Sequence, residues 1–347
     1  MKEYFSRHRF TRRRTDRVAV LGWLVIGLLV LSALFAGFLS PYDYSAQSRT
    51  EPSAPATTIH FSGLRPIIHP RRVEDPLRRT YTEDTSVAIP IEFLVRGYSY
   101  KFVGVTETDV HLFGVKNTSA LAARINLLGT DPLGRDRFSR LLYALRFSLI
   151  VAFSGVLVAC LAGILLGGVS GYAGRRVDTF LMGATDAMLA LPTLILILGV
   201  RAAFPLELPV SRAALLLLLI FALTGWAEIA RLTRGLVLSM RQREFVVAAV
   251  ALGVSQTRVL FRHILPNILP SLRTRALLLL PTFLLAEVAL SYLGVGLQEP
   301  EPSLGNMLTA ASDLDQLRSQ PFSVLSPAFA VLLFTLGVRL IGRKERI

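Results

Sequence analysis

Three carboxylates are the side chains best placed to do chemistry. Asp186, Glu228 and Glu287 lie in or beside runs that are otherwise apolar, and an ionisable group in such a run marks a functional interior or an ion pair by default. Three converging carboxylates could serve general acid–base catalysis. Asp186 and Glu228 are expected near one membrane face and Glu287 toward the other, which argues against an intramembrane enzyme. For Asp186 we favour a helix cap or a pair with an arginine, because Arg176 and Asp178 place that face close by.

A second acidic pair, Asp131 and Asp136, lies in a turn-rich string. Asp-Pro flanked by glycines is typical of turns, and Asp–Arg pairs can tie a turn to the start of the next helix. The acid pair could also exchange protons, but no nucleophile, metal-ligand set or oxyanion device accompanies it. These residues therefore predict an ordered loop. The string consists of Gly129, Thr130, Asp131, Pro132, Leu133, Gly134, Arg135 and Asp136.

Metal, disulfide and nucleotide chemistry have no support in the sequence. Cys160 is the single cysteine and lies within an apolar run, which excludes a disulfide framework and predicts a small buried side chain. The five histidines have no helical spacing to another ligand type. The chain has no GxxxxGK[ST] phosphate loop. We therefore predict no catalytic residue, no metal and no cofactor.

One stretch, Glu244 to Asn267, is neither apolar enough to span a bilayer nor polar enough to be a plain linker. Small and apolar residues recur there at helical spacing, which predicts a contact face on a short helix. Basic residues follow on a second turn, and Pro266 is expected to stop or kink that helix because it lacks a backbone donor. The pattern predicts a helix, a turn and a helix at a membrane surface. The candidate contact residues are Glu244, Phe245, Ala248, Ala249, Leu252, Gly253, Arg258, His263 and Pro266.

The composition predicts that long membrane helices position these residues. Of the 347 residues, 52% are hydrophobic, and the mean hydropathy is +0.51, which favours an integral membrane protein over soluble domains. The net charge of +14 could indicate nucleic acid, but the basic residues flank apolar runs without interleaved aromatic residues. We therefore expect the lipid bilayer as a partner, and no nucleic acid.

The fold class predicted is an all-α membrane protein with six transmembrane helices. A span needs roughly 20 residues to cross about 30 Å of hydrocarbon. The first apolar run is too long for the core of a signal peptide and has no small-x-small cleavage site after it. The predicted spans are 18–42, 147–169, 179–200, 213–228, 272–293 and 324–341.

Basic residues set the expected orientation. Residues 1–17 carry seven Lys or Arg, and such a run stays on the cytoplasmic side. Counting spans from there places 43–128 outside and the loop 231–267 inside, within a five-helix core of residues 129–341. The tail 342–347 is basic and falls inside. We expect a multi-pass protein of the cell (inner) membrane with both termini in the cytoplasm.

Residues 43–128 are predicted to form a soluble insert, partly β, between the first two spans. The first half, to about Glu83, is rich in proline and predicts an extended wrap. Val87–Val95 and Tyr98–Val105 are β-prone and predict a hairpin that turns at Arg96-Gly97. We expect a solvated cap over the outer mouth, with a role in receiving cargo or the binding protein as the alternative.

Three strings resemble a known family. The Glu244–Asn267 stretch resembles the EAA loop of permease subunits in binding-protein-dependent ABC importers, through Ala248, Ala249, Gly253 and the closing His263-Ile264-Leu265-Pro266-Asn267. The string 129–136 is similar to the GTDxLGRD segment of the dipeptide, oligopeptide and nickel subfamily. Residues 287–307 resemble that subfamily's outer turn. One departure is visible, because the family's acidic position holds Val247 here, with Glu244 three residues upstream. The resemblance covers residues 1–42 and 128–341.

The resemblance implies a permease subunit of an ATP-driven importer that works by alternating access. The EAA-like loop would be the cytoplasmic coupling helix. The implied partners are two ABC ATPase subunits, which hydrolyse the ATP, a second homologous permease and an extracytoplasmic binding protein. Peptides are the cargo expected first, with nickel or a peptide-like antibiotic as alternatives. Functions of other classes are an intramembrane enzyme, or a channel or secondary transporter with broken inverted repeats.

Overall fold

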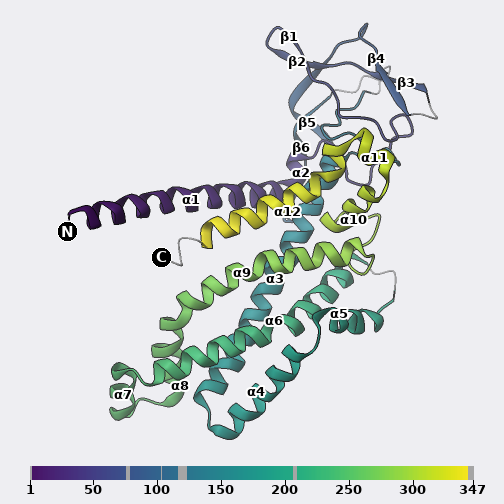
Figure 1. Ribbon diagram of the computed structural model, residues 1–347. Coiled ribbons are helices and arrows are strands. Elements are labelled where there is room, and N and C mark those ends of the chain that lie inside the picture. The colour runs from purple at the N-terminus through teal and green to yellow at the C-terminus, as the bar shows by residue number, and fades with distance from the viewer. Residues whose placement is uncertain (1, 76–78, 103, 116–122, 206–208, 343–347) are drawn as a thin grey trace. The chain divides into compact units, whose positions relative to one another are not determined.

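The computed structural model describes residues 2–75, 79–102, 104–115, 123–205 and 209–342, and its chain divides into two compact units (Figure 1). The helical unit comprises Met1–Trp23, Ile150–Glu287 and Thr335–Ile347. The sheet-bearing unit comprises Leu24–Leu149 and Val288–Phe334. Apart from Gly342, the predicted tail 342–347 lies outside the described residues.

Five helices are long and apolar enough to cross a membrane, and a bent pair brings the number to six if it counts as one span. The bent pair is α4, Arg175–Ala190, and α5, Thr193–Ala202, whose axes differ by 96°. The predicted span 179–200, which we expected Pro192 to interrupt, is thus two helices with a sharp bend between them. Pro192 forces the preceding Leu191 into extended geometry, with ψ 130°, and the helix breaks there. The five long helices are α1 Lys2–Leu34, α3 Arg137–Tyr172, α6 Val210–Arg241, α9 Leu265–Tyr292 and α12 Pro321–Gly342.

Two predicted span ends are corrected. The helix α1 ends at Leu34, and after a break at Phe35 the short α2, Ala36–Leu39, follows, so the first span is shorter than 18–42. The helix α6 continues to Arg241 instead of stopping near Glu228. The predicted loop 231–267 therefore begins with three turns of helix.

Close packing of α3 against α6 organises the helical unit. Gly163, Gly167 and Gly171 lie four residues apart on α3, and a methyl group at any of them would collide with α6. Glycines at this spacing let two membrane helices approach closely. Further along, Phe221 of α6 stacks on Phe283 of α9 with ring centroids 4.6 Å apart, so α6 is fixed on both sides.

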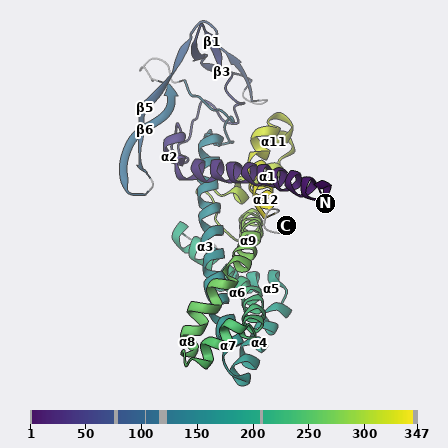
Figure 2. The same ribbon diagram turned by 90° about the vertical axis from the view of Figure 1, so that its left-hand side faces the viewer.

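The insert of the sheet-bearing unit is β throughout its described core (Figure 2). Four antiparallel strands lie in the order β1-β2-β5-β6, and β3 pairs with β4. The extended wrap predicted up to Glu83 is wrong, because four of the six strands lie there. The strands are β1 His60–Ser62, β2 Arg65–Ile68, β3 Arg71–Asp75, β4 Thr80–Glu83, β5 Ile89–Phe102 and β6 Thr106–Val115.

The hairpin of the insert turns later in the sequence than predicted. The strand β5 runs through Arg96-Gly97 and pairs with β6 as far as Phe102 and Thr106. A glycine does not always mark a turn, and in a strand it often marks a bulge. Gly97 lies where the register between β5 and β6 shifts, between Arg96 and Tyr100. Gly97 faces the ring of His111, where a Cβ would clash.

A clamp holds the hairpin to α2 within the sheet-bearing unit (Figure 2). The buried His111 ring lies between two carbonyl oxygens, with Nδ1 2.9 Å from Gly37 O and Nε2 3.0 Å from Tyr98 O. The neutral ring donates a hydrogen bond to one of them, and the tautomer decides which. Tyr100 covers Gly37, and Phe102 contacts Phe35 with ring centroids 5.5 Å apart. The insert is therefore attached directly to the end of the first span.

The turn before α3 is bonded to the first residues of the insert. Ser53 N–H donates to Asp131 O at 2.8 Å, and Thr130 N–H donates to Ala54 O at 2.9 Å. Gly134 has a φ of +73°, and a Cβ there would collide with the Ser48 carbonyl. This position therefore requires glycine for both backbone conformation and space.

Gly134→Ala is predicted to destabilise the protein by about 2–5 kcal/mol, because left-handed strain adds to overpacking. Gly63→Ala is the matched control, since Gly63 has a φ of +63° and no atom within 4 Å of a Cβ, so it should lose only about 1 kcal/mol. Denaturant unfolding of the purified full-length protein measures both. Equal losses would show that the contact with Ser48 is not part of the fold.

Candidate functional site: an exposed helix and an arginine-lined cavity

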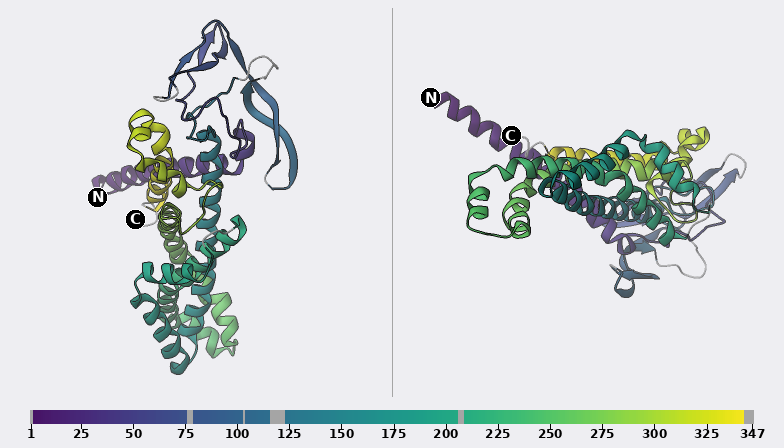
Figure 3. Two further views of the ribbon diagram at one scale, coloured as in Figure 1. Left: turned by 90° about the vertical axis from the view of Figure 1, so that its right-hand side faces the viewer. Right: turned by 90° about the horizontal axis from the view of Figure 1, so that it is seen from below.

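The first candidate site is α7, Glu244–Ala251, at the ends of α6 and α9 (Figures 1 and 3). Gly253 ends it with a φ of +80°. Its N–H donates to Val250 O at 2.9 Å, and Val254 N–H donates to Ala249 O at 3.1 Å. These two bonds form a Schellman motif, which satisfies the last carbonyls of a helix. The role that the structure gives Gly253 is thus to cap α7.

One side of α7 is anchored to the helical unit. Val246 and Ala249 are buried in a cluster with Val237 of α6 and with Val259 and Ile264, which follow α7. The prediction that Ala249 lies on the outward contact face is therefore wrong. Val246 and Ala249 are three residues apart and therefore lie on the same face of α7. This is the face that packs against the helical unit.

The rest of the α7 surface is apolar and exposed. Leu252 is 85% exposed, and Phe245, Val247 and Val250 are between 45% and 56% exposed. Phe261 adds a further ring, 57% exposed. Apolar side chains gathered on one exposed segment mark an interaction surface. We call this surface the α7 face; its residues are Phe245, Val247, Ala248, Val250, Leu252 and Gly253.

The second half of the segment corrects the expectation for Pro266. The helix α8, Gln256–Arg258, leads into a π-helical turn, Val259–Ile264, and directly into α9. Leu265 N–H donates to Leu260 O, five residues back. The π-helical turn lies directly before Pro266, and this local change in the hydrogen-bond ladder accommodates a residue that lacks a backbone donor. Glu244, Arg258 and Pro266 are exposed and His263 is partly buried.

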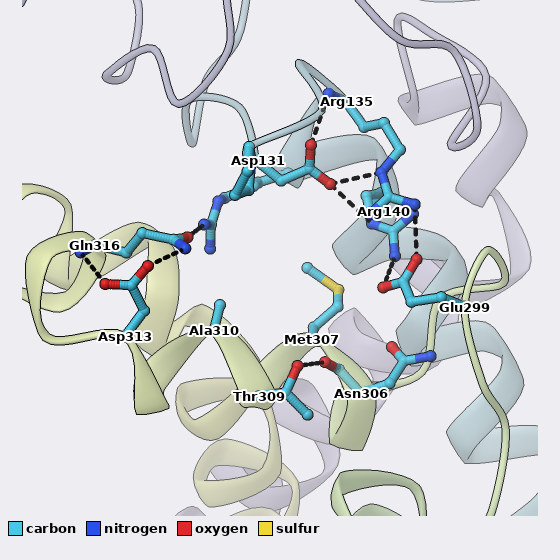
Figure 4. Close-up of a pocket in the computed structure, with 12 residues that line it drawn as sticks. Asp131, Arg135, Arg140, Glu299, Asn306, Met307, Thr309, Ala310, Asp313 and Gln316 are labelled. Atoms are coloured by element: carbon cyan, nitrogen blue, oxygen red, sulfur yellow. Dashed lines mark hydrogen bonds and ion pairs between the residues drawn. The ribbon is translucent and has the colours of Figure 1, made fainter. Parts of the chain in front are cut away.

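The second candidate site is an arginine cluster in the sheet-bearing unit (Figure 4). Arg135 Nε donates to Asp131 Oδ2 at 2.6 Å, and its Nη1 donates to Glu299 Oε2 at 2.6 Å. Arg140 Nη2 donates to the other oxygen of Glu299 at 2.7 Å. Asp131 Oδ1 accepts the backbone N–H of Leu133 and of Arg135. The turn predicted from the sequence is thus fixed by charge-assisted bonds.

Arg137 belongs to the same cluster but has different partners. Its side chain donates from Nε to Thr130 O at 3.2 Å and from Nη2 to Gln316 Oε1 at 2.5 Å. Gln316 Nε2 in turn donates to Asp313, which caps α11, Leu314–Ser319. The cluster lines a cavity of about 290 Å³. Its walls are Asp131, Pro132, Arg135, Arg137, Arg140, Glu299, Asn306, Met307, Thr309, Ala310, Asp313 and Gln316.

The remaining residues of the 129–136 string support the backbone. Asp136 is fully buried and accepts from Ser139 N–H at 2.8 Å and Ser139 Oγ at 2.6 Å. Burial raises the pKa of Asp136 to about 6, since desolvation disfavours the charged form. Thr130 Oγ1 accepts from Ala54 N–H at 2.8 Å, and Gly129 has a φ of +73°.

The carboxylates singled out in the apolar runs are separated. Asp186 pairs with Arg231, which is the interpretation favoured from the sequence. Glu228 pairs with Arg275 of α9. Glu287 is fully buried, twelve residues beyond Arg275 on α9, or about 18 Å along the helix axis. Glu228 and Glu287 therefore cannot act on one substrate atom. Within the described ranges, no group of His, Cys, Asp or Glu could hold a metal ion.

Sequence reasoning missed several residues of these sites. Glu299 and Gln316 lie more than 150 residues from the arginines they contact, so no local pattern connects them. The glycines 163, 167 and 171 had a readable signal, because small residues at intervals of four in an apolar run predict close helix packing. Asp178, which pairs with Arg234 with 2.6 Å between Oδ2 and Nη2, was used only to place a membrane face.

Comparison with known proteins identifies the family. The family described as binding-protein-dependent transport system inner membrane component matches residues 163–343. The N-terminal TM domain of oligopeptide transport permease C matches residues 6–55.

Named relatives agree. A dipeptide transport system permease protein of Alkalihalophilus pseudofirmus is 37% identical over 214 residues, covering 62% of this chain and 68% of that protein. An oligopeptide transport system permease protein of Bacillus subtilis is 26% identical over 331 residues, covering 95% of this chain and 84% of that protein. A di/tripeptide transport system permease protein of Pseudomonas aeruginosa is 35% identical over 216 residues, covering 62% and 69%. This chain therefore belongs to the inner membrane permeases of binding-protein-dependent ABC transport systems, in the dipeptide and oligopeptide group.

Proposed function

We propose that this chain is one transmembrane permease subunit of an ATP-driven peptide importer and that the ATPase subunit binds it at the α7 face. The observation that carries the coupling role is an apolar surface on a helix that projects from α6 and α9, with Leu252 85% exposed. Monomeric proteins rarely expose a large contiguous apolar patch to water, and such a patch marks an interaction site. The names of the relatives, which are peptide permeases, support the substrate class.

The anchoring of α7 supports a mechanical role for it. The buried cluster of Val246 and Ala249 with Val237, Val259 and Ile264 joins α7 to α6 and to the helix that becomes α9. Packed side chains of this kind transmit displacement because interiors are dense and hardly compressible. A movement of the ATPase pair would therefore shift two spans together. ATP can bias the permease only through different contacts in its inward- and outward-facing states.

The assembly follows from the family. A permease of this kind is a multi-pass inner membrane component, not a catalytic subunit, and it works with ATPase and binding-protein partners. Beyond that, we propose two ATPase subunits, a second homologous permease, and both termini of this chain in the cytoplasm. The α7 face is then cytoplasmic, and the insert 43–128 lies outside as a cap.

Other functions have less support. An intramembrane enzyme would need carboxylates that meet, whereas Asp186 and Glu228 are each paired with an arginine from a neighbouring helix. An importer of nickel or of a peptide-like antibiotic would have the same architecture. The choice of cargo would then be made by the binding protein.

Leu252→Asp is predicted to reduce ATP-dependent peptide uptake about 10- to 100-fold, because a carboxylate would be desolvated inside an apolar contact. Thr257→Asp is the control, since Thr257 is exposed on α8, outside the α7 face. Uptake of a labelled peptide into cells, at equal amounts of permease in the membrane, measures the effect. Uptake by Leu252→Asp equal to that of Thr257→Asp would refute the docking role of the α7 face.

Co-purification tests the assembly separately. Full-length tagged chain in mild detergent is expected to retain an ABC ATPase and a second permease, and Leu252→Asp should lose the ATPase while keeping the second permease. Quantitative mass spectrometry of the eluate gives both ratios. Purification of the unaltered chain alone would favour a channel or an enzyme instead.

A further inference from the structure

Two of the three arginines in the cavity have their charges compensated within the cluster. Arg135 and Arg140 share Glu299, and both reach Asp131, at 2.6 Å for Arg135 and 4.0 Å for Arg140. Two cations and two carboxylates thus form a closed set. These four side chains need no further ion, and they fix the wall of the cavity in place.

Arg137 is the third, and no carboxylate forms an ion pair with it in the described part of the chain, although the charge of Asp131 acts on it from farther away. Its residue exposure is 4%, and its bonds go to the Thr130 carbonyl and the Gln316 amide. Both acceptors are neutral. A guanidinium stays charged in proteins, and a buried charge without an opposite charge is strongly unfavourable. Asp313 is held one residue further away, behind Gln316.

The cavity beside Arg137 has room for a ligand. It has a volume of about 290 Å³, which is at the lower end of the sizes of small-molecule pockets. Met307 and Ala310 add apolar surface to its wall, on the side opposite Asp131 (Figure 4). A ligand with one anionic group and a short aliphatic part would match both kinds of wall.

We propose that this cavity is a binding site for a carboxylate group, which Arg137 binds as its counterion. The planar guanidinium fork fits a carboxylate through two parallel hydrogen bonds. A doubly charged phosphate fits less well, because Arg137 supplies one positive charge and Asp313 already puts negative charge on the wall. The carboxylate is either the C-terminus of a free peptide or an acidic side chain of the substrate-binding protein. The second source rests on the proposed function.

Binding to the full-length protein in detergent tests the site, with Ala-Ala-Ala and its C-terminal amide as probes. If the ligand is a peptide, the free acid should bind more tightly than the amide. Arg137→Gln should weaken that binding about 10- to 100-fold, since it removes a pair of charge-assisted hydrogen bonds. Arg137→Lys, which keeps the charge, should restore part of it. Arg65→Gln is the control, because Arg65 is exposed on β2.

The second arm uses the substrate-binding protein as the probe. If the carboxylate is its side chain, the free acid and the amide bind alike, and Arg137→Gln instead weakens its affinity for the permease about 10-fold or more. Neither measurement uses the ATPase, so failure of the docking role of the α7 face does not affect this test. The proposal is overturned if Arg137→Gln, with an unfolding temperature equal to that of Arg65→Gln, binds both probes as Arg65→Gln does.

Discussion

The structure depends on one constraint, which is that every backbone polar group within hydrocarbon must find its partner inside its own helix. In the five long helices irregular backbone is therefore displaced to the ends, whereas the α4–α5 pair breaks at Leu191. The helix α6 has 32 residues and a length of about 48 Å, well beyond the roughly 30 Å of hydrocarbon. The continuous helix from Gln256 to Tyr292 has 37 residues. The excess length of these two helices carries α7, so its exposed apolar side chains need not lie in lipid.

Ion pairs keep those overlong helices together where the apolar pattern weakens. Arg231 and Arg234 of α6 pair with Asp186 and Asp178 of α4, and Glu228 pairs with Arg275 of α9. The same arginines misled the prediction, because charges were taken to end the fourth span near Glu228. An arginine can lie within a continuing helix when an aspartate on the adjacent helix pairs with it. The hydropathy of one segment does not reveal whether such an aspartate is present on another.

The sequence was informative where one element decides the outcome alone. Runs of apolar residues predicted the number of spans to within the α4–α5 bend, since partition into lipid depends on composition. Predictions from the sequence failed where the outcome depends on contacts with another element. Ala249 was assigned to the contact face because residue spacing shows which side chains share a helix face but not which way that face points. The hairpin turn was placed at Gly97, but glycine is needed there because the His111 ring on the facing strand leaves no room for a Cβ. Pro266 was expected to stop or kink the helix, and the structure has a π-helical turn before it and a helix that continues beyond it.

The 129–136 string illustrates the difference between a recognisable motif and a functional residue. Gly134 and Asp136 are needed by the local backbone and by the contacts of the turn, as the Ser48 approach and the Ser139 bonds demonstrate. Arg135 is neutralised by Asp131 and Glu299. Arg137, one residue beyond the string, has only neutral hydrogen-bond partners. A turn this rigid holds that guanidinium at a fixed position in the cavity wall, and rigid placement of a buried charge is what lets a site select one anionic group over its neutral analogue.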